Sequence, residues 1–117
     1  MKVIDPEFWK SRRVLVTGHT GFKGSWLAPG LERMGAQVAG ISLANDDPLS
    51  IYKLAGVSCL VEEVIGDIGD SDVVSRCCLK FKPDIVFHLA AQPLVRTSYD
   101  DPVETFRTNI LGTVRLL

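Results

Sequence analysis

Three regularly spaced glycines are the residues of this chain best suited to holding a ligand. Gly18, Gly21 and Gly24 form the pattern G-x-x-G-x-x-G directly after the apolar run of residues 13–17. The first glycine permits a tight turn, the second lets backbone approach an anion, and the third lets a following helix pack closely. Backbone N–H groups and the positive end of the helix dipole would then face a phosphate. The strand–loop–helix setting favours the pyrophosphate of NAD or NADP over a plain turn.

Short apolar runs and stretches of helical period alternate along the rest of the chain, which predicts buried strands separated by helices. Strands are expected at residues 13–17, 37–41, 60–65 and 84–89, and helices at 23–34, 48–55, 71–81 and 102–117. Continuous apolar strands are typical of a parallel sheet covered on both faces. The predicted fold is therefore α/β: a partial doubly wound parallel Rossmann sheet of about four strands, in the order 3-2-1-4, with flanking helices.

Cap residues and apolar positions define the predicted helices in more detail. Gly35 is expected to end the first long helix, and Asp70 to cap the helix at 71–81. One face of the first helix is expected to be apolar and to carry Trp26, Leu27, Leu31 and Met34. The apolar face of the last helix is expected to carry Phe106, Ile110, Val114 and Leu117. A doubly wound sheet needs further strands beside the fourth. Residues 1–117 are therefore expected to be the N-terminal part of a dinucleotide-binding domain.

Composition excludes several classes of protein. The 117 residues are 46% apolar and 23% charged with a net charge of −1, which is typical of a soluble globular chain without attraction to nucleic acid or anionic lipid. No apolar stretch reaches the roughly 18 residues of a membrane span. Cys59, Cys77 and Cys78 form no C-x-x-C pair, so free thiols in a reducing cytoplasm are expected and a metal site is not.

Three further motifs follow the later strands. Asp67 and Ile68 come after the third strand, residues 88–91 read H-L-A-A at the end of the fourth, and Asn109 begins the pattern N-x-x-G-T. With the glycine loop, these motifs resemble the extended short-chain dehydrogenase/reductase superfamily. The resemblance implies that Asp67 and Ile68 hold the adenine ring and that H-L-A-A lines the ribose on the nicotinamide side. An unpaired Asn109 amide would be costly to bury, so a functional role is favoured over a solvent-edge asparagine.

One branch of that superfamily resembles nearly the whole chain. Residues 17–27, T-G-H-T-G-F-K-G-S-W-L, are similar to the CDP-glucose 4,6-dehydratases, as are residues 4–9 and 90–105. Epimerases and dTDP-glucose dehydratases usually carry an apolar residue at the position of Lys23. The GDP-mannose dehydratases carry Gln-Asp in place of Phe22-Lys23.

This resemblance implies a lyase reaction, the conversion of CDP-D-glucose to CDP-4-keto-6-deoxy-D-glucose for bacterial surface polysaccharides. Hydride leaves C4 of the glucose for NAD, water is eliminated across C5 and C6, and the same hydride returns to C6. CDP-glucose is then the expected partner, and homo-oligomer formation by the complete protein stays open.

NAD is expected in preference to NADP. Ser42 follows the second strand, where an aspartate would favour NAD and an arginine would hold the 2′-phosphate. Asp46 and Asp47 come shortly after and would repel that phosphate. The predicted cofactor-binding residues are Gly18, His19, Thr20, Gly21, Phe22, Lys23, Gly24, Ser42, Asp67, Ile68, Leu89, Ala90, Ala91, Gln92 and Asn109. No catalytic residue and no metal ligand is expected.

Several side chains keep two interpretations. Lys23 opposes the helix dipole unless an anion is bound, so it is either an anion contact or a solvated lysine. His19 either contacts the cofactor or fills the loop surface. His88 is interpreted as a buried, hydrogen-bonded residue rather than a catalyst. Two interpretations also stand for Gln92, Arg96 and Tyr99: they contact the substrate or the nicotinamide, or they make ordinary loop contacts.

Two features depart from the family pattern. The catalytic Tyr-x-x-x-Lys is absent, because Gly56 and Val103 stand four residues after the two tyrosines. Pro29-Gly30 lies inside the first helix, at a cost of about 3 kcal/mol for proline and about 1 kcal/mol for glycine relative to alanine. The helix could tolerate a kink near Ala28, but looser packing is expected there.

Three hypotheses follow. The chain is the cofactor-binding part of a sugar-nucleotide dehydratase or epimerase, inactive alone. Alternatively, it is a non-catalytic NAD(P)-binding module of the same superfamily. In the third, it does not fold stably alone, because the fourth strand has an unpaired apolar edge.

Overall fold

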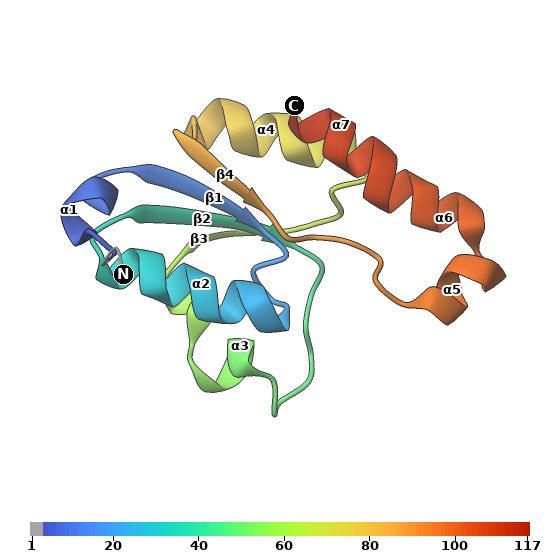
Figure 1. Cartoon of the computed structure of the whole chain (residues 1–117), viewed down its shortest axis with the longest axis horizontal. Helices are drawn as coiled ribbons and strands as arrows, with labels where there is room; N and C mark the ends of the chain where they lie inside the picture. Colours follow the sequence, from blue (N-terminus) through green and yellow to red (C-terminus); the bar gives the residue numbers. More distant parts are fainter. Residues whose placement is uncertain (1–3) are drawn as a thin grey trace.

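Four parallel strands form one sheet in the order β3-β2-β1-β4 (Figure 1). The computed structural model describes residues 4–117. The strands are β1 (Arg13–Thr17), β2 (Gln37–Ser42), β3 (Glu62–Ile65) and β4 (Ile85–His88). Thr17 pairs with both Ile41 and His88, and Ser42 pairs with Ile65, so the strands end at one edge of the sheet. The predicted α/β class, parallel sheet and strand order are confirmed.

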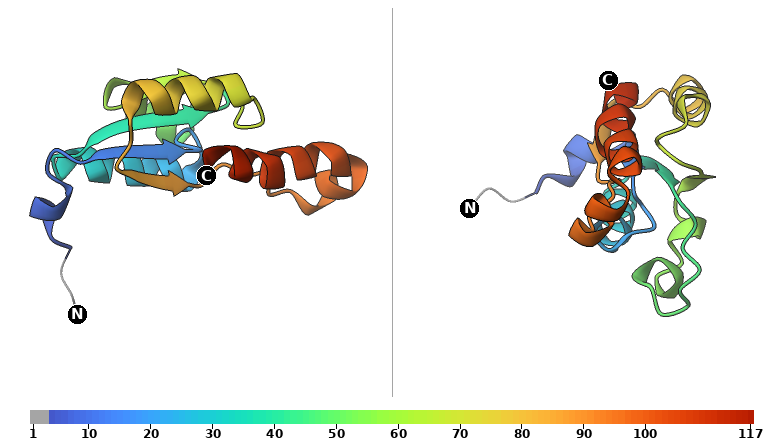
Figure 2. Two further views of the ribbon diagram at one scale, coloured as in Figure 1. Left: turned by 90° about the horizontal axis from the view of Figure 1, so that it is seen from above. Right: turned by 90° about the vertical axis from the view of Figure 1, so that its right-hand side faces the viewer.

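Helices cover both faces of this sheet. They are α1 (Pro6–Trp9), α2 (Phe22–Arg33), α3 (Ile51–Leu54), the 3₁₀ turn η1 (Val57–Cys59), α4 (Ser71–Phe81), α5 (Val95–Asp100), α6 (Pro102–Phe106), the π segment η2 (Arg107–Leu111) and α7 (Gly112–Leu116). Figure 1 shows α2 and α3 against one face, with α4 and α7 on the other. Figure 2 shows the continuous helix α6–η2–α7 extending beyond the ends of the strands.

Alternation along β1 divides the core into two clusters. Successive strand residues point to opposite faces, so Val14 and Val16 pack with Leu31 of α2, while Leu15 packs with Val74 of α4. These side chains are all at most 1% exposed. Both faces of the sheet are therefore sealed around β1, the strand that leads into the glycine loop.

The ends of two helices agree with the cap residues predicted from the sequence. Asp70 caps α4 by accepting a hydrogen bond from the Asp72 N–H at 2.9 Å. Gly35 follows the last turn of α2 with φ +87°, a left-handed conformation that glycine adopts without strain. The helix expected at 48–55 is shorter, the strand expected at 60–65 begins only at Glu62, and α1 and α5 were not predicted.

The prediction that Trp26 shares the buried face of α2 was wrong. Leu31 is 1% exposed and Leu27 and Met34 pack against the core, but Trp26 is 65% exposed. Each helical residue turns by about 100°, so Trp26 lies well round the helix from Leu27.

Pro29 does not interrupt α2. The helix runs from Phe22 to Arg33 with Pro29 inside it, and its neighbours Ala28 and Leu31 stay buried at 0% and 1% exposure. The expected looser packing is not observed.

The last predicted helix is confirmed in extent, but it contains the π segment η2. Its apolar stripe faces solvent: Phe106 is 62% and Val114 60% exposed. No helix within residues 4–117 has the length and apolar character needed to cross a membrane.

Candidate cofactor-binding site

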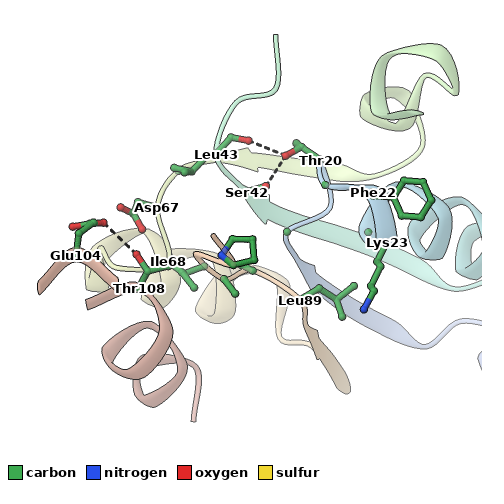
Figure 3. A pocket seen from close by; sticks show the side chains of 17 residues that line it. Thr20, Phe22, Lys23, Ser42, Leu43, Asp67, Ile68, Leu89, Glu104 and Thr108 are labelled. Atoms are coloured by element: carbon green, nitrogen blue, oxygen red, sulfur yellow. Dashed lines mark hydrogen bonds between the residues drawn. The ribbon is translucent and has the colours of Figure 1, made fainter. Parts of the chain in front are cut away.

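A cleft of about 650 Å³ opens at the edge of the sheet where the strands end (Figure 3). Doubly wound sheets bind ligands at this edge, where the strand order reverses. The cleft is lined by Gly18, Thr20, Gly21, Phe22, Lys23, Gly24, Ser42, Leu43, Gly66, Asp67, Ile68, Leu89, Ala90, Ala91, Pro93, Glu104 and Thr108. It is thus built from the loops after all four strands and from helix α6–η2.

Two glycines of the loop are required by close backbone contacts. Gly18 has φ +76°, and a Cβ there would lie 2.9 Å from the Ala90 nitrogen. A Cβ on Gly24 would overlap the Gly18 carbonyl oxygen and lie 2.6 Å from Cα of His19. Hydrogen bonds from Gly18 N to Ile41 O (2.8 Å) and from Gly21 N to Gly18 O (3.1 Å) hold the turn.

The N-terminus of α2 opens into this cleft. Phe22, Lys23 and Gly24 form its first turn and line the cleft, and the Gly21 cap provides no side-chain hydrogen bond to them. The first N–H groups of a helix have no partner within the helix. Together with the dipole and the Lys23 ammonium, they form a site of positive potential that suits a pyrophosphate.

Hydroxyl groups close the cleft at the end of β2. Thr20 donates its hydroxyl proton to the Leu43 carbonyl oxygen at 3.0 Å, so the 2.7 Å contact between Ser42 and Thr20 uses the Ser42 proton. Asn45 donates to the Thr20 carbonyl at 2.8 Å. Ser42 and Leu43 therefore offer oxygen acceptors, which suit a ribose hydroxyl and not a phosphate.

The neutral side chain of His88 fixes the end of β4 by hydrogen bonds. Thr17 accepts hydrogen bonds from the N–H groups of Leu89 (3.1 Å) and Ala90 (3.2 Å). Its one proton therefore goes to His88 Nδ1 at 2.7 Å, and His88 Nε2–H donates to Thr113 at 2.9 Å. Burial lowers the pKa of His88 from 6.5. His88 is a structural link between β1 and α7, as interpreted from the sequence.

This link gives a pH dependence. Because the pKa of His88 is lower in the folded than in the unfolded chain, protons bind the unfolded chain more tightly. The stabilisation is complete above about pH 6.5 and is lost as the pH falls through the lower folded value. We expect thermal midpoints of the wild type to decline below about pH 6.5 and those of His88→Phe to decline less. If the thermal midpoints of the wild type and of His88→Phe decline equally below about pH 6.5, the structural role of a neutral His88 is contradicted.

Asn109 in η2 fixes the loop that follows β4. Its Oδ1 accepts from the Gln92 N–H at 2.8 Å, and its Nδ2 donates to the Gln92 carbonyl at 3.1 Å. The Gln92 side chain turns to Leu94 and Thr105. Both the oxygen and the nitrogen of the Asn109 amide thus bond backbone groups of Gln92, which explains the position of this residue on the helix.

Replacing Asn109 by alanine removes both hydrogen bonds and leaves the Gln92 N–H and C=O unpaired. We expect a loss of about 1–3 kcal/mol in the free energy of unfolding and faster amide exchange across residues 89–92. Denaturant unfolding and hydrogen–deuterium exchange measure the two effects. Exchange that is faster everywhere except in this loop would refute the role of Asn109.

His19 lies in a cluster behind the loop. Its fully buried ring bonds Glu63 Oε2 through Nε2 at 2.8 Å, and Tyr52 donates to the same oxygen at 2.5 Å. Burial would raise the pKa of Glu63, but the hydrogen bonds from Tyr52 and His19 outweigh it and the pKa is lowered. A Cβ on Gly40 would overlap the His19 ring. The side chain therefore supports the loop from beneath.

Of the fifteen predicted cofactor contacts, twelve line the cleft. His19, Gln92 and Asn109 do not, because their side chains bond other parts of the protein. Five further residues that line the cleft were not predicted from the sequence: Leu43, Gly66, Pro93, Glu104 and Thr108. Arg96 and Tyr99 are exposed on α5 outside the cleft.

The strand order, glycine loop and cleft define a Rossmann fold of the extended short-chain dehydrogenase/reductase type. A sequence model described as GDP-mannose 4,6 dehydratase matches residues 15–117, and the chain belongs to that family.

Relatives and solved structures agree with this membership. The chain is 51% identical over 115 residues to CDP-glucose 4,6-dehydratase of Salmonella typhimurium, covering 98% of this chain and 32% of the relative. It is 35% identical over 114 residues to GDP-mannose 4,6-dehydratase of Vibrio cholerae, covering 91% and 30%. UDP-glucose 4-epimerase from Thermus thermophilus in complex with NAD superposes with a TM-score of 0.73 at 34% identity, covering 89% and 32%. The chain thus spans about a third of the length of these proteins.

Proposed function

We propose that this chain forms the cofactor-binding part of an NAD-dependent CDP-glucose 4,6-dehydratase. The observation that carries the proposal is the continuous cleft along the carboxyl edge of the sheet, which joins the α2 N-terminus to the loops after β2, β3 and β4. The 51% identity to a CDP-glucose 4,6-dehydratase supports the choice of substrate.

The residues of the cleft fit the parts of a dinucleotide. The glycine loop leaves no room for a Cβ at Gly18 or Gly24 and offers backbone N–H groups to the pyrophosphate. Asp67 and Ile68 provide a carboxylate and an apolar wall for the adenine end. Leu89, Ala90 and Ala91 line the nicotinamide end on the loop that Thr17 and Asn109 hold.

The hydroxyl pair at the end of β2 favours NAD over NADP. Ser42 donates its hydroxyl proton to Thr20, and Thr20 donates its own to the Leu43 carbonyl. What remains is oxygen lone pairs, which accept from a 2′-hydroxyl and repel a 2′-phosphate. When bound, NAD would take up the C4 hydride of the sugar and return it to C6.

Two measurements test the proposal. Calorimetry on the complete protein is expected to show NAD binding at least ten-fold tighter than NADP binding. Incubation with CDP-glucose labelled with deuterium at C4 is expected to give a 4-keto-6-deoxy product with deuterium at C6, without added oxidant. Matched incubations with UDP-glucose and GDP-mannose test the substrate. NAD binding without turnover of any of the three would favour a non-catalytic module instead.

A further inference from the structure

Arg107 joins helix α6–η2 to the loop after β3. Its Nη2 bonds Asp67 Oδ2 at 2.5 Å, and its Nε bonds Glu104 Oε2 at 2.7 Å. The Arg107 side chain is 34% and that of Asp67 32% exposed, so the pair lies at the rim of the cleft and not in open solvent. Asp67 and Glu104 both line the cleft (Figure 3). Arg107 is therefore shared between two carboxylates of the same wall.

Glycines on both sides fit the loop and the helix to each other. A Cβ on Gly69 of the loop would overlap the Arg107 guanidinium. Conversely, a Cβ on Gly112 of the helix would lie 2.8 Å from Cδ1 of Ile68. Arg115 adds a hydrogen bond to the Gly69 carbonyl. The Arg107–Asp67 contact thus belongs to a close-fitting junction.

The Asp67 carboxylate is held through both of its oxygens. Oδ1 accepts from the Gly69 N–H at 2.7 Å, and Oδ2 accepts from Arg107. A carboxylate oxygen has two acceptor sites, so each can take one more donor from the cleft. Burial would raise the pKa of Asp67, but the hydrogen bonds from Arg107 and Gly69 lower it overall. The group is an oriented acceptor for an N–H donor.

We propose that Arg107 is a positioning residue that orients Asp67 to accept a hydrogen bond from the 6-amino group of adenine. The inference rests on the proposed function. Without Arg107, the Asp67 carboxylate is held only by the Gly69 N–H and is no longer separated from the Glu104 charge. Because Arg107 keeps Asp67 oriented as an acceptor, Arg107 determines the selectivity for adenine over a purine that carries a 6-oxo group.

Nicotinamide hypoxanthine dinucleotide tests this selectivity, because an oxo group replaces the 6-amino group of NAD. Calorimetry on the complete protein compares wild type, Arg107→Met and the control Arg76→Met, a change on the exposed side of α4. We expect Arg107→Met to weaken NAD binding about ten-fold and to affect the hypoxanthine analogue much less. The control is expected to match the wild type for both ligands.

A double-mutant cycle with Asp67→Asn tests the route of the effect. If Arg107 acts through Asp67, adding Arg107→Met to Asp67→Asn changes NAD affinity little further. Additive losses, or equal weakening of both dinucleotides by Arg107→Met, would overturn the proposal. Arg107→Gln, which keeps an N–H donor, is expected to recover part of the selectivity and serves if the methionine variant does not fold. A wild type that binds neither dinucleotide would refute the proposed function itself.

Discussion

Replacing Gly24 with alanine is expected to abolish measurable NAD binding. The added Cβ would overlap the Gly18 carbonyl oxygen and press on Cα of His19, both of which are backbone atoms of the loop. Neither can move without opening the turn that Gly18 and Gly21 form. Calorimetric titration with NAD measures the loss, and thermal unfolding shows whether α2 has shifted.

The same helix offers a matched control. A Cβ on Gly30 meets no atom within 4 Å, so Gly30→Ala is expected to stabilise the protein by about 1 kcal/mol through helix propensity alone. Gly21→Ala is intermediate, since its Cβ would lie 3.3 Å from the Gly18 oxygen. That variant is expected to fold and to bind NAD weakly. Equal NAD affinity in the Gly24 and Gly30 variants would disprove the assignment of the loop.

Replacing Pro29 with alanine is expected to raise the free energy of unfolding by about 3 kcal/mol. Proline has no N–H to donate to the Ser25 carbonyl, and its ring crowds that oxygen. The buried neighbours Ala28 and Leu31 show that the helix keeps its packing despite this cost. Thermal denaturation is expected to show a rise in the midpoint on the order of 10 °C.

Pro48 is the matched control for this change. It is exposed and stands outside the helices, so Pro48→Ala is expected to alter stability by less than about 0.5 kcal/mol. A Pro29→Ala variant no more stable than the Pro48 variant would mean that α2 tolerates proline without cost.

Features read from local sequence were predicted well. The glycine loop, the Asp70 cap and the four strands depend on residues close to one another in the chain. The supporting contacts of the site do not. Arg107 meets Asp67 across 40 positions and His19 meets Glu63 across 44, and a single sequence carries no signal for such pairs.

One missed contact did have a signal. Gly40 stands inside a strand, where glycine often marks the close approach of another group. The group is the His19 ring, which leaves no space for a Cβ at that position. This glycine could have indicated that another group packs closely against β2, although it does not identify the group as His19. The partner of Asn109 had no such signal in the sequence, because it is the backbone of Gln92 and not a side chain.

The row of side chains through His88 has a consequence for proton movement. The Thr17 hydroxyl is occupied by two backbone N–H groups, and at the far end Thr113 donates to the carbonyl of Asn109. Both ends are amide groups that neither release nor take up protons near neutral pH. The row therefore has a fixed polarity and conducts no proton, although its Thr–His–Thr order resembles a relay. The proposed dehydration would therefore need its acid and base from other groups.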